Sequence, residues 1–162
     1  MLYIEIAIVA VLILVNGLLA MSELAIVSAR PVRLKAMVDR GTRGAAKALA
    51  LGADPGKFLS SVQIGITLVG VLSGAFSGAT LGDRLATFLA VQGVPENVAD
   101  LLGVGMVVAL ITYASLIIGE LVPKQIALRN PEQVAARAAP FMAALAKVAA
   151  PLVFLLDVSG RF

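Results

Sequence analysis

The chain has 162 residues, of which 60% are hydrophobic and 14% are charged. Soluble domains usually hold about 45–50% apolar and about 25% charged residues, so this composition indicates a membrane protein. The net charge of +3 does not indicate nucleic-acid binding, because the basic residues lie where membrane proteins carry their cytoplasmic ones. The chain has no cysteine and no histidine, which excludes disulfides, thiolate sites and the commonest general base. A bound metal would need oxygen ligands, as Mg²⁺, Ca²⁺, Na⁺ and Mn²⁺ do.

Three apolar runs predict membrane-spanning helices, at about residues 2–28, 58–81 and 101–122. Each is long enough to cross a hydrocarbon core of about 30 Å. The first run is too long for a signal peptide, no basic residue precedes it, and it contains Glu5. We expect Glu5 to lie near the outer end of its helix and to extend its carboxylate to the interface.

Basic residues concentrate between the first two runs and after the third. Residues 29–57 carry seven Lys or Arg against two Asp, whereas residues 82–100 carry one basic residue. The positive-inside rule therefore places the N-terminus outside and the loop at 29–57 in the cytoplasm.

Two further segments, at about 32–51 and 132–158, predict juxtamembrane helices. The first is expected to break near Gly41 and Gly44, and the second contains Pro140 and Pro151. We interpret the two as an amphipathic collar in the inner interface, with a cytoplasmic C-terminus. A fourth span is the alternative, and it would place the C-terminus outside. The predicted fold is thus an all-α membrane protein, a single transmembrane domain over residues 1–162.

The segment Gly-Glu-Leu-Val-Pro-Lys at 119–124 ends the third run. Pro123 has no N–H and its ring displaces the carbonyl four residues earlier, so the Gly119 carbonyl loses its helical partner. This free carbonyl beside the Glu120 carboxylate would suit a hard cation. Alternatively, Pro123 ends a helix and Glu120 pairs with Lys124 at i+4. The motif alone leaves both interpretations open.

A second carboxylate, Glu23, lies in the inner part of the first run, at a depth similar to that of Glu120. Ionisable groups inside a membrane cost about 2.5–3.5 kcal/mol each at the lower estimates. An interhelical hydrogen-bond network, at about 0.6 kcal/mol per bond, would hardly offset two of them. We therefore favour a site that binds and releases a cation. Its candidate ligands are Asn16, Ser22, Glu23, Gln63, Thr67, Ser115, Glu120 and the Gly119 carbonyl.

The second run carries a stripe of small and polar residues at helical spacing. Small residues let membrane helices approach closely, so the simplest interpretation of the stripe is helix packing. The alternative is a cavity lining that unwinds locally. The predicted packing or hinge positions are Gly70, Gly74, Gly78 and Pro123.

Segments 16–23, 63–70 and 119–124 resemble the transmembrane domain of the CorC/HlyC family, bacterial relatives of the cyclin M magnesium transporters. The resemblance extends over essentially the whole chain. It implies three transmembrane helices with a juxtamembrane collar, assembled as a homodimer in the inner membrane. It also implies Mg²⁺ export, with Na⁺ as coupling ion in some members. Family members usually continue into cytoplasmic CBS domains, and because this sequence contains none, we expect an isolated membrane domain.

The resemblance also implies a ligand set. Family members use a serine-type residue of the first helix, often an asparagine of the second, and the glutamate that Glu120 matches. This chain has Ala20 and Met21 where many relatives have Ser-Gly, which leaves Ser22 as a substitute. The second helix has Ile66 and Gly70 in place of the asparagine, which leaves Gln63, Thr67 or backbone carbonyls.

Two rival functions remain. The first is a Na⁺ or H⁺ carrier that uses Glu23 and Glu120. The second is a dimeric membrane anchor for regulatory CBS domains, with no transport. Catalysis is not expected, since the chain has no nucleophile elbow and no phosphate-binding glycine loop. The expected partners are a second copy, membrane lipid and the CBS domains, without nucleic acid.

Overall fold

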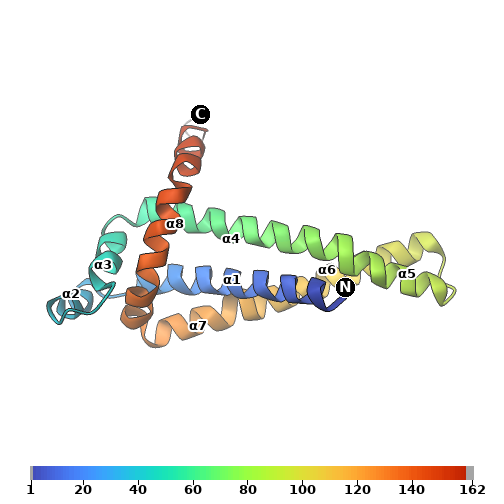
Figure 1. Ribbon diagram of the computed structural model, residues 1–162, viewed down its shortest axis with the longest axis horizontal. Coiled ribbons are helices and arrows are strands. Elements are labelled where there is room, and N and C mark those ends of the chain that lie inside the picture. The colour runs from blue at the N-terminus through green and yellow to red at the C-terminus, as the bar shows by residue number, and fades with distance from the viewer. Residues whose placement is uncertain (1, 160–162) are drawn as a thin grey trace.

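The computed structural model describes residues 2–159, and that part of the chain is helical without strands. Four of its helices are long and apolar enough to cross a membrane. Two of these are composite, because a π-helical segment joins two α-helices without a break (Figure 1). The elements are α1 Leu2–Ser28, α2 Pro31–Asp39, α3 Ala45–Ala53, α4 Pro55–Ser77, η1 Gly78–Gly82, α5 Asp83–Val91, α6 Glu96–Leu116, η2 Ile117–Leu121, α7 Val122–Arg129 and α8 Pro131–Ser159.

The two composite helices form one long hairpin whose turn contains Gly93, at a φ of 94°. The sequence predicts that these spans end near 81 and begin near 101, but the helices continue to Val91 and start at Glu96. No proline or glycine interrupts α5, so nothing stops the helix there. A Cβ on Gly103 would lie 2.7 Å from the Ala86 Cα, so glycine allows α5 and α6 to pack closely.

Helix α1 lies between the two arms of this hairpin, with α4 on one side and η2 and α7 on the other (Figure 1). Throughout residues 2–159, no Cα of α4 comes within 8 Å of one in η2 or α7. Helix α1 packs extensively on both α4 and α7 and lies between them.

Helix α8 runs across the three long helices near the end that is remote from the α5–α6 turn (Figure 1). It is continuous through Pro140 and Pro151. Its length and composition would allow it to span a membrane, while its crosswise course is the one expected of a collar. The number of spans and the collar assignment therefore stay predictions. The core beneath it includes the fully buried side chains of Phe58, Val62 and Met142.

The short helices α2 and α3 are separated at Gly41 and Gly44, where φ is 72° and 84°. These left-handed values favour glycine. A Cβ on Gly44 would also collide with the Ala136 carbonyl, so this glycine lets α3 pack against α8.

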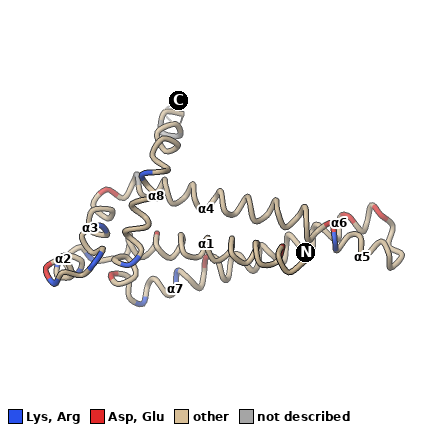
Figure 2. The backbone as a smooth tube through the Cα atoms, viewed as in Figure 1, with Lys and Arg blue, Asp and Glu red and all other residues tan. Residues whose placement is uncertain are grey.

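Lys and Arg gather at the end formed by α2, α3, α7 and α8, and the α5–α6 end is mainly acidic (Figure 2). This asymmetry agrees with the predicted cytoplasmic side, and the orientation itself stays a prediction.

Candidate cation site

The 119–124 motif covers the end of the π-helical turn η2 and the start of α7. The Val122 N–H donates to the Ile117 carbonyl, five residues earlier, and α7 continues the helix directly afterwards. The wider turn accommodates Pro123, whose ring would otherwise press on the carbonyl of Gly119. Such π-bulges are frequent at functional sites. The expectation that Pro123 could end a helix is wrong, since it lies inside a continuous one.

Helix α1 makes its closest contact with the hairpin at this turn. A Cβ on Gly17 would lie 2.9 Å from the Pro123 Cγ and 3.0 Å from the Ile118 oxygen. A Cβ on Gly119 would lie 3.3 Å from the Ile13 oxygen. The two glycines thus bring the backbones of α1 and η2 together.

Asn16 sits at this contact and binds the free carbonyl. Its Nδ2 donates to the Gly119 oxygen over 3.2 Å. Its Oδ1 is buried and has no hydrogen-bond partner in the part of the chain described. The structure therefore brings together two of the predicted ligands and leaves one amide oxygen unsatisfied beside them.

One of the two predicted carboxylates forms an ion pair at this turn. The Lys124 Nζ lies 2.6 Å from the Glu120 Oε1, so the i+4 pair that the sequence left open is formed. Glu23, on α1, is partly buried, and among the described residues no ion pair or hydrogen bond joins its carboxylate to Lys124. Helices α1 and η2 pack against each other, and the similar depth of the two carboxylates stays a prediction.

Other predicted ligands lie elsewhere. Gln63 and Thr67 are exposed on α4, which makes no close approach to η2. The Ser22 Oγ is buried and donates to the Leu18 carbonyl over 2.5 Å, and Ser22 lines a cavity shared with α8. Ser115 is partly buried and lies two residues before η2. Residues 2–159 contain no group of three or more acidic side chains that could hold a metal ion.

The glycine stripe of α4 divides into two parts. A Cβ on Gly70 or Gly74 would meet nothing within 4 Å. A Cβ on Gly78 would lie 3.8 Å from the Val108 side chain, so this glycine packs against α6. The stripe therefore serves packing inside the chain only at its η1 end.

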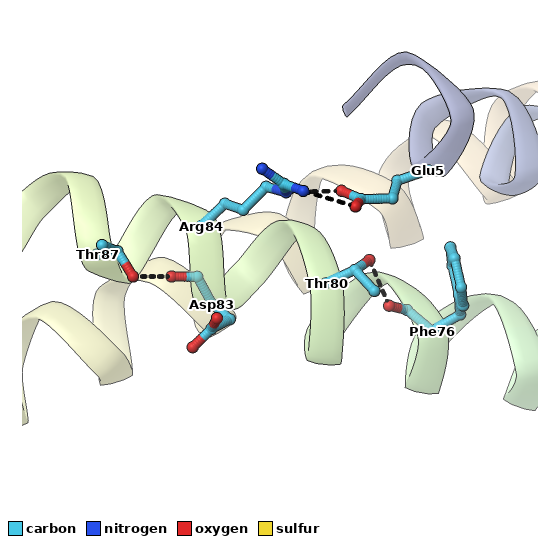
Figure 3. Close-up of polar contacts among 6 residues, drawn as sticks. All are labelled: Glu5, Phe76, Thr80, Asp83, Arg84 and Thr87. Carbon is cyan, nitrogen blue, oxygen red and sulfur yellow. Dashed lines mark hydrogen bonds and ion pairs between the residues drawn. The ribbon is translucent and has the colours of Figure 1, made fainter. Parts of the chain in front are cut away.

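The sequence interpretation missed an ion pair at the opposite end of the molecule. The Arg84 Nε and Nη2 donate to the two carboxylate oxygens of Glu5 over 2.7 and 2.8 Å (Figure 3). The sequence interpretation gave Glu5 no partner, and whether its carboxylate reaches the interface stays a prediction. The Thr80 and Thr87 hydroxyls bond the carbonyls of Phe76 and Asp83, four residues earlier, on either side of Arg84 (Figure 3). Arg84 is the single basic residue in 82–100, and this was the only sign of an ion pair in the sequence. Its partner Glu5 could not be predicted, because the two residues meet only when α5 continues the helix of α4.

Comparison with known proteins assigns the chain to a family. The family model of the cyclin M transmembrane N-terminal domain matches residues 7–162. This chain belongs to that family. The cyclin M domain is 50% identical over 155 residues to the UPF0053 protein sll0260 of Synechocystis, covering 96% of this chain and 35% of the relative.

Two further relatives have names that state a function. The polyamine export proteins of Haemophilus influenzae and Escherichia coli are 29% and 28% identical to this cyclin M domain. The matches cover 93% and 94% of this chain and 34% of each relative. The chain thus spans about a third of the length of these relatives. With its four long apolar helices, it is a multi-pass membrane protein.

Proposed function

We propose that this cyclin M domain transports cations, and that it exports Mg²⁺ from the cytoplasm with Na⁺ as coupling ion. The observation that carries the proposal is that Glu120, paired with Lys124, follows the Gly119 carbonyl at the contact of η2 with α1, the helix that also carries Glu23, in a domain otherwise built for a bilayer. Carboxylates at this depth are costly unless they are used. The basic end of the molecule would face the cytoplasm and present this site to the ion.

Lys124 has a defined part in the proposed cycle. Without cargo its ammonium balances the Glu120 charge. An entering cation would displace the ammonium and take over both carboxylates. The unsatisfied Asn16 Oδ1 lies beside the same turn, and rotation of its amide would free the Gly119 carbonyl. Mg²⁺ binds about six oxygens and usually retains several waters, so few protein ligands suffice.

The predicted ligands that lie away from Glu120 can bind the cation only after the helices or side chains move. Gln63 and Thr67 lie on an exposed face of α4. In this proposal they join the site when α4 moves along α1, or they act from a second copy in a homodimer. Ser22 would need to leave the Leu18 carbonyl. These ligands therefore belong to a later step than Glu23 and Glu120.

The test is Mg²⁺ flux in proteoliposomes that contain the 162-residue chain and an enclosed Mg²⁺-sensitive dye. Glu120→Gln should lower the flux by about tenfold or more, since even supporting groups of metal sites contribute 10–100-fold in affinity. Glu96→Gln, in the exposed first turn of α6, is the matched control and should transport normally. Equal Mg²⁺ flux in both variants would contradict the proposal that Glu120 binds the transported cation. A pH-dependent Na⁺ flux without Mg²⁺ would favour the carrier alternative, and dimers without any flux would favour the membrane anchor.

A second candidate cargo is a polyamine. Two relatives are named polyamine export proteins, and the described part of the chain holds no group of three acidic ligands. The contact between the Lys124 ammonium and Glu120 shows how an alkylammonium fits this carboxylate. Parallel flux assays with Mg²⁺ and with radiolabelled spermidine distinguish the two cargoes. Spermidine flux that falls in both Glu23→Gln and Glu120→Gln, without Mg²⁺ flux, would favour the polyamine.

A further inference from the structure

A cavity of about 360 Å³ lies between α1 and α8, on a different face of α1 from Asn16 and Gly17. Its volume lies within the range of about 300–1,000 Å³ that is typical of ligand pockets. Leu18 and Met21 line it from α1, and Ala138 and Phe141 line it from α8. The cavity is therefore mainly apolar and distinct from the contact of Asn16 with Gly119, although Ser22, a predicted ligand, lies on its wall.

Only two polar side chains line this cavity. Ser22 has its hydrogen bond to the Leu18 carbonyl, so it needs no ligand. Arg137 is exposed, and no ion pair or hydrogen bond to it exists within the described residues. Other exposed basic residues, such as Arg43 and Lys147, also have no carboxylate partner among the described residues, but they do not line this cavity. An unpaired guanidinium beside an apolar cavity is complementary to a molecule with an anionic head and an apolar tail.

The position of the cavity indicates which kind of molecule binds in it. It lies at the basic end of the molecule, where α8 crosses α1 (Figure 2). Anionic lipids attract basic groups at the cytoplasmic surface of a membrane. Arginine also matches phosphate geometry, because its planar fork can donate two parallel hydrogen bonds. A helix from a partner protein would fill the apolar walls but would need an additional acidic group for Arg137.

We propose that this cavity binds an anionic phospholipid, with one acyl chain between α1 and α8 and the phosphate on Arg137. The lipid binds α1 and the crossing helix α8 at once. It thereby fixes the angle at which α8 crosses the bundle. Lipid binding in this cavity does not depend on the identity of the cargo.

The chain contains no tryptophan, which allows a direct test. Phe141→Trp places a single fluorophore on an exposed position of the cavity wall. The variant is reconstituted into phosphatidylcholine vesicles that contain either phosphatidylglycerol or phosphatidylcholine with brominated acyl chains. Bromine quenches tryptophan on contact. We expect about a fivefold preference for phosphatidylglycerol, which corresponds to about 1 kcal/mol from one basic residue.

Arg137→Gln in the same background should abolish this preference. Lys147→Gln, which removes the same charge from an exposed position of the same helix, is the matched control and should retain it. Ala138→Leu adds volume to the cavity wall and should weaken quenching by both lipids while Arg137 is present. Equal quenching by the two lipids, or a preference that survives Arg137→Gln, would overturn the proposal. Absence of quenching by either lipid would mean that a second copy covers the cavity, and would overturn it too.

Discussion

Pro123 takes one backbone donor out of the long helix that runs from Glu96 to Arg129, and Asn16 supplies a donor from α1 in its place. The hydrogen bond from Asn16 joins two helices, whereas the bond that Pro123 cannot make would have joined two turns of one helix. The π-turn at Ile117–Leu121 gives the Gly119 carbonyl room to point toward α1. At the scale of single residues, the loss of one N–H thus produces both the local geometry and an interhelical contact.

Replacing Asn16 tests this exchange. Asn16→Ala leaves the Gly119 carbonyl without its donor, and we expect a loss of about 1 kcal/mol in the free energy of unfolding. This value lies between the average of about 0.6 kcal/mol for interhelical bonds in membranes and about 1–3 kcal/mol for an unsatisfied buried group. Denaturant unfolding in mixed micelles measures it. Thr112→Ala, at an exposed position of α6, should change stability by less than about 0.5 kcal/mol. Equal losses in both variants would show that the bond contributes nothing.

At the scale of elements, glycine determines where helices touch. Gly17 and Gly119 allow α1 to contact η2 closely, whereas Gly105 on α6 has nothing within 4 Å of an added Cβ. A methyl group therefore has opposite consequences at two helical glycines. At Gly17 it meets the Pro123 ring and the Ile118 carbonyl. At Gly105 it only improves helix propensity.

Gly17→Ala should destabilise the domain by about 1–3 kcal/mol, the usual cost of overpacking. Gly105→Ala should leave it unchanged or stabilise it by about 0.5–1 kcal/mol. Thermal unfolding in detergent compares the two directly. We also expect Gly17→Ala to weaken cation binding, because it separates α1, which carries Glu23, from the turn that carries Glu120. A Gly17→Ala protein as stable as the wild type would contradict the close packing.

The pair of Glu5 and Arg84 joins α1 to α5 at the end remote from the candidate site. Glu5→Gln and Arg84→Gln should each lower the midpoint of thermal unfolding, because each breaks the same bidentate contact. The double variant should show a shift no larger than that of the more affected single variant. Shifts that simply add would mean that the two side chains stabilise the domain independently.

At the scale of the whole molecule, the sequence predicted the helical class and the three apolar runs, whereas the role of Glu120 stays a prediction. Composition and the length of an apolar run are local properties of the sequence, so they predict membrane helices without knowledge of the fold. The grouping of ligands could not be predicted in full, because helical spacing does not say which helix lies next to which. Asn16 and Glu23 lie near Glu120 because α1 occupies the middle of the bundle. Gln63 and Thr67 lie apart from it for the same reason.

The exposed face of α4 leads to a prediction about assembly. Gln63 and Thr67 are exposed on it, and Gly70 and Gly74 face open space. Polar side chains on an apolar helix gain hydrogen bonds when another helix packs on them, and small residues permit close approach. We therefore expect α4 to meet α4 of a second copy in the predicted homodimer.

The absence of cysteine in the chain makes this contact simple to detect. Gly70→Cys should form disulfide-linked dimers when oxidised in native membranes, because symmetry brings equivalent residues of a homodimer close to the axis. Leu14→Cys, at an exposed apolar position of α1, is the control and should stay monomeric on a non-reducing gel. Efficient linkage through Leu14→Cys but not through Gly70→Cys would place the dimer axis beside α1. In that case the α4 stripe faces lipid, and Gln63 and Thr67 can reach the cation site only by a movement of α4 within one chain.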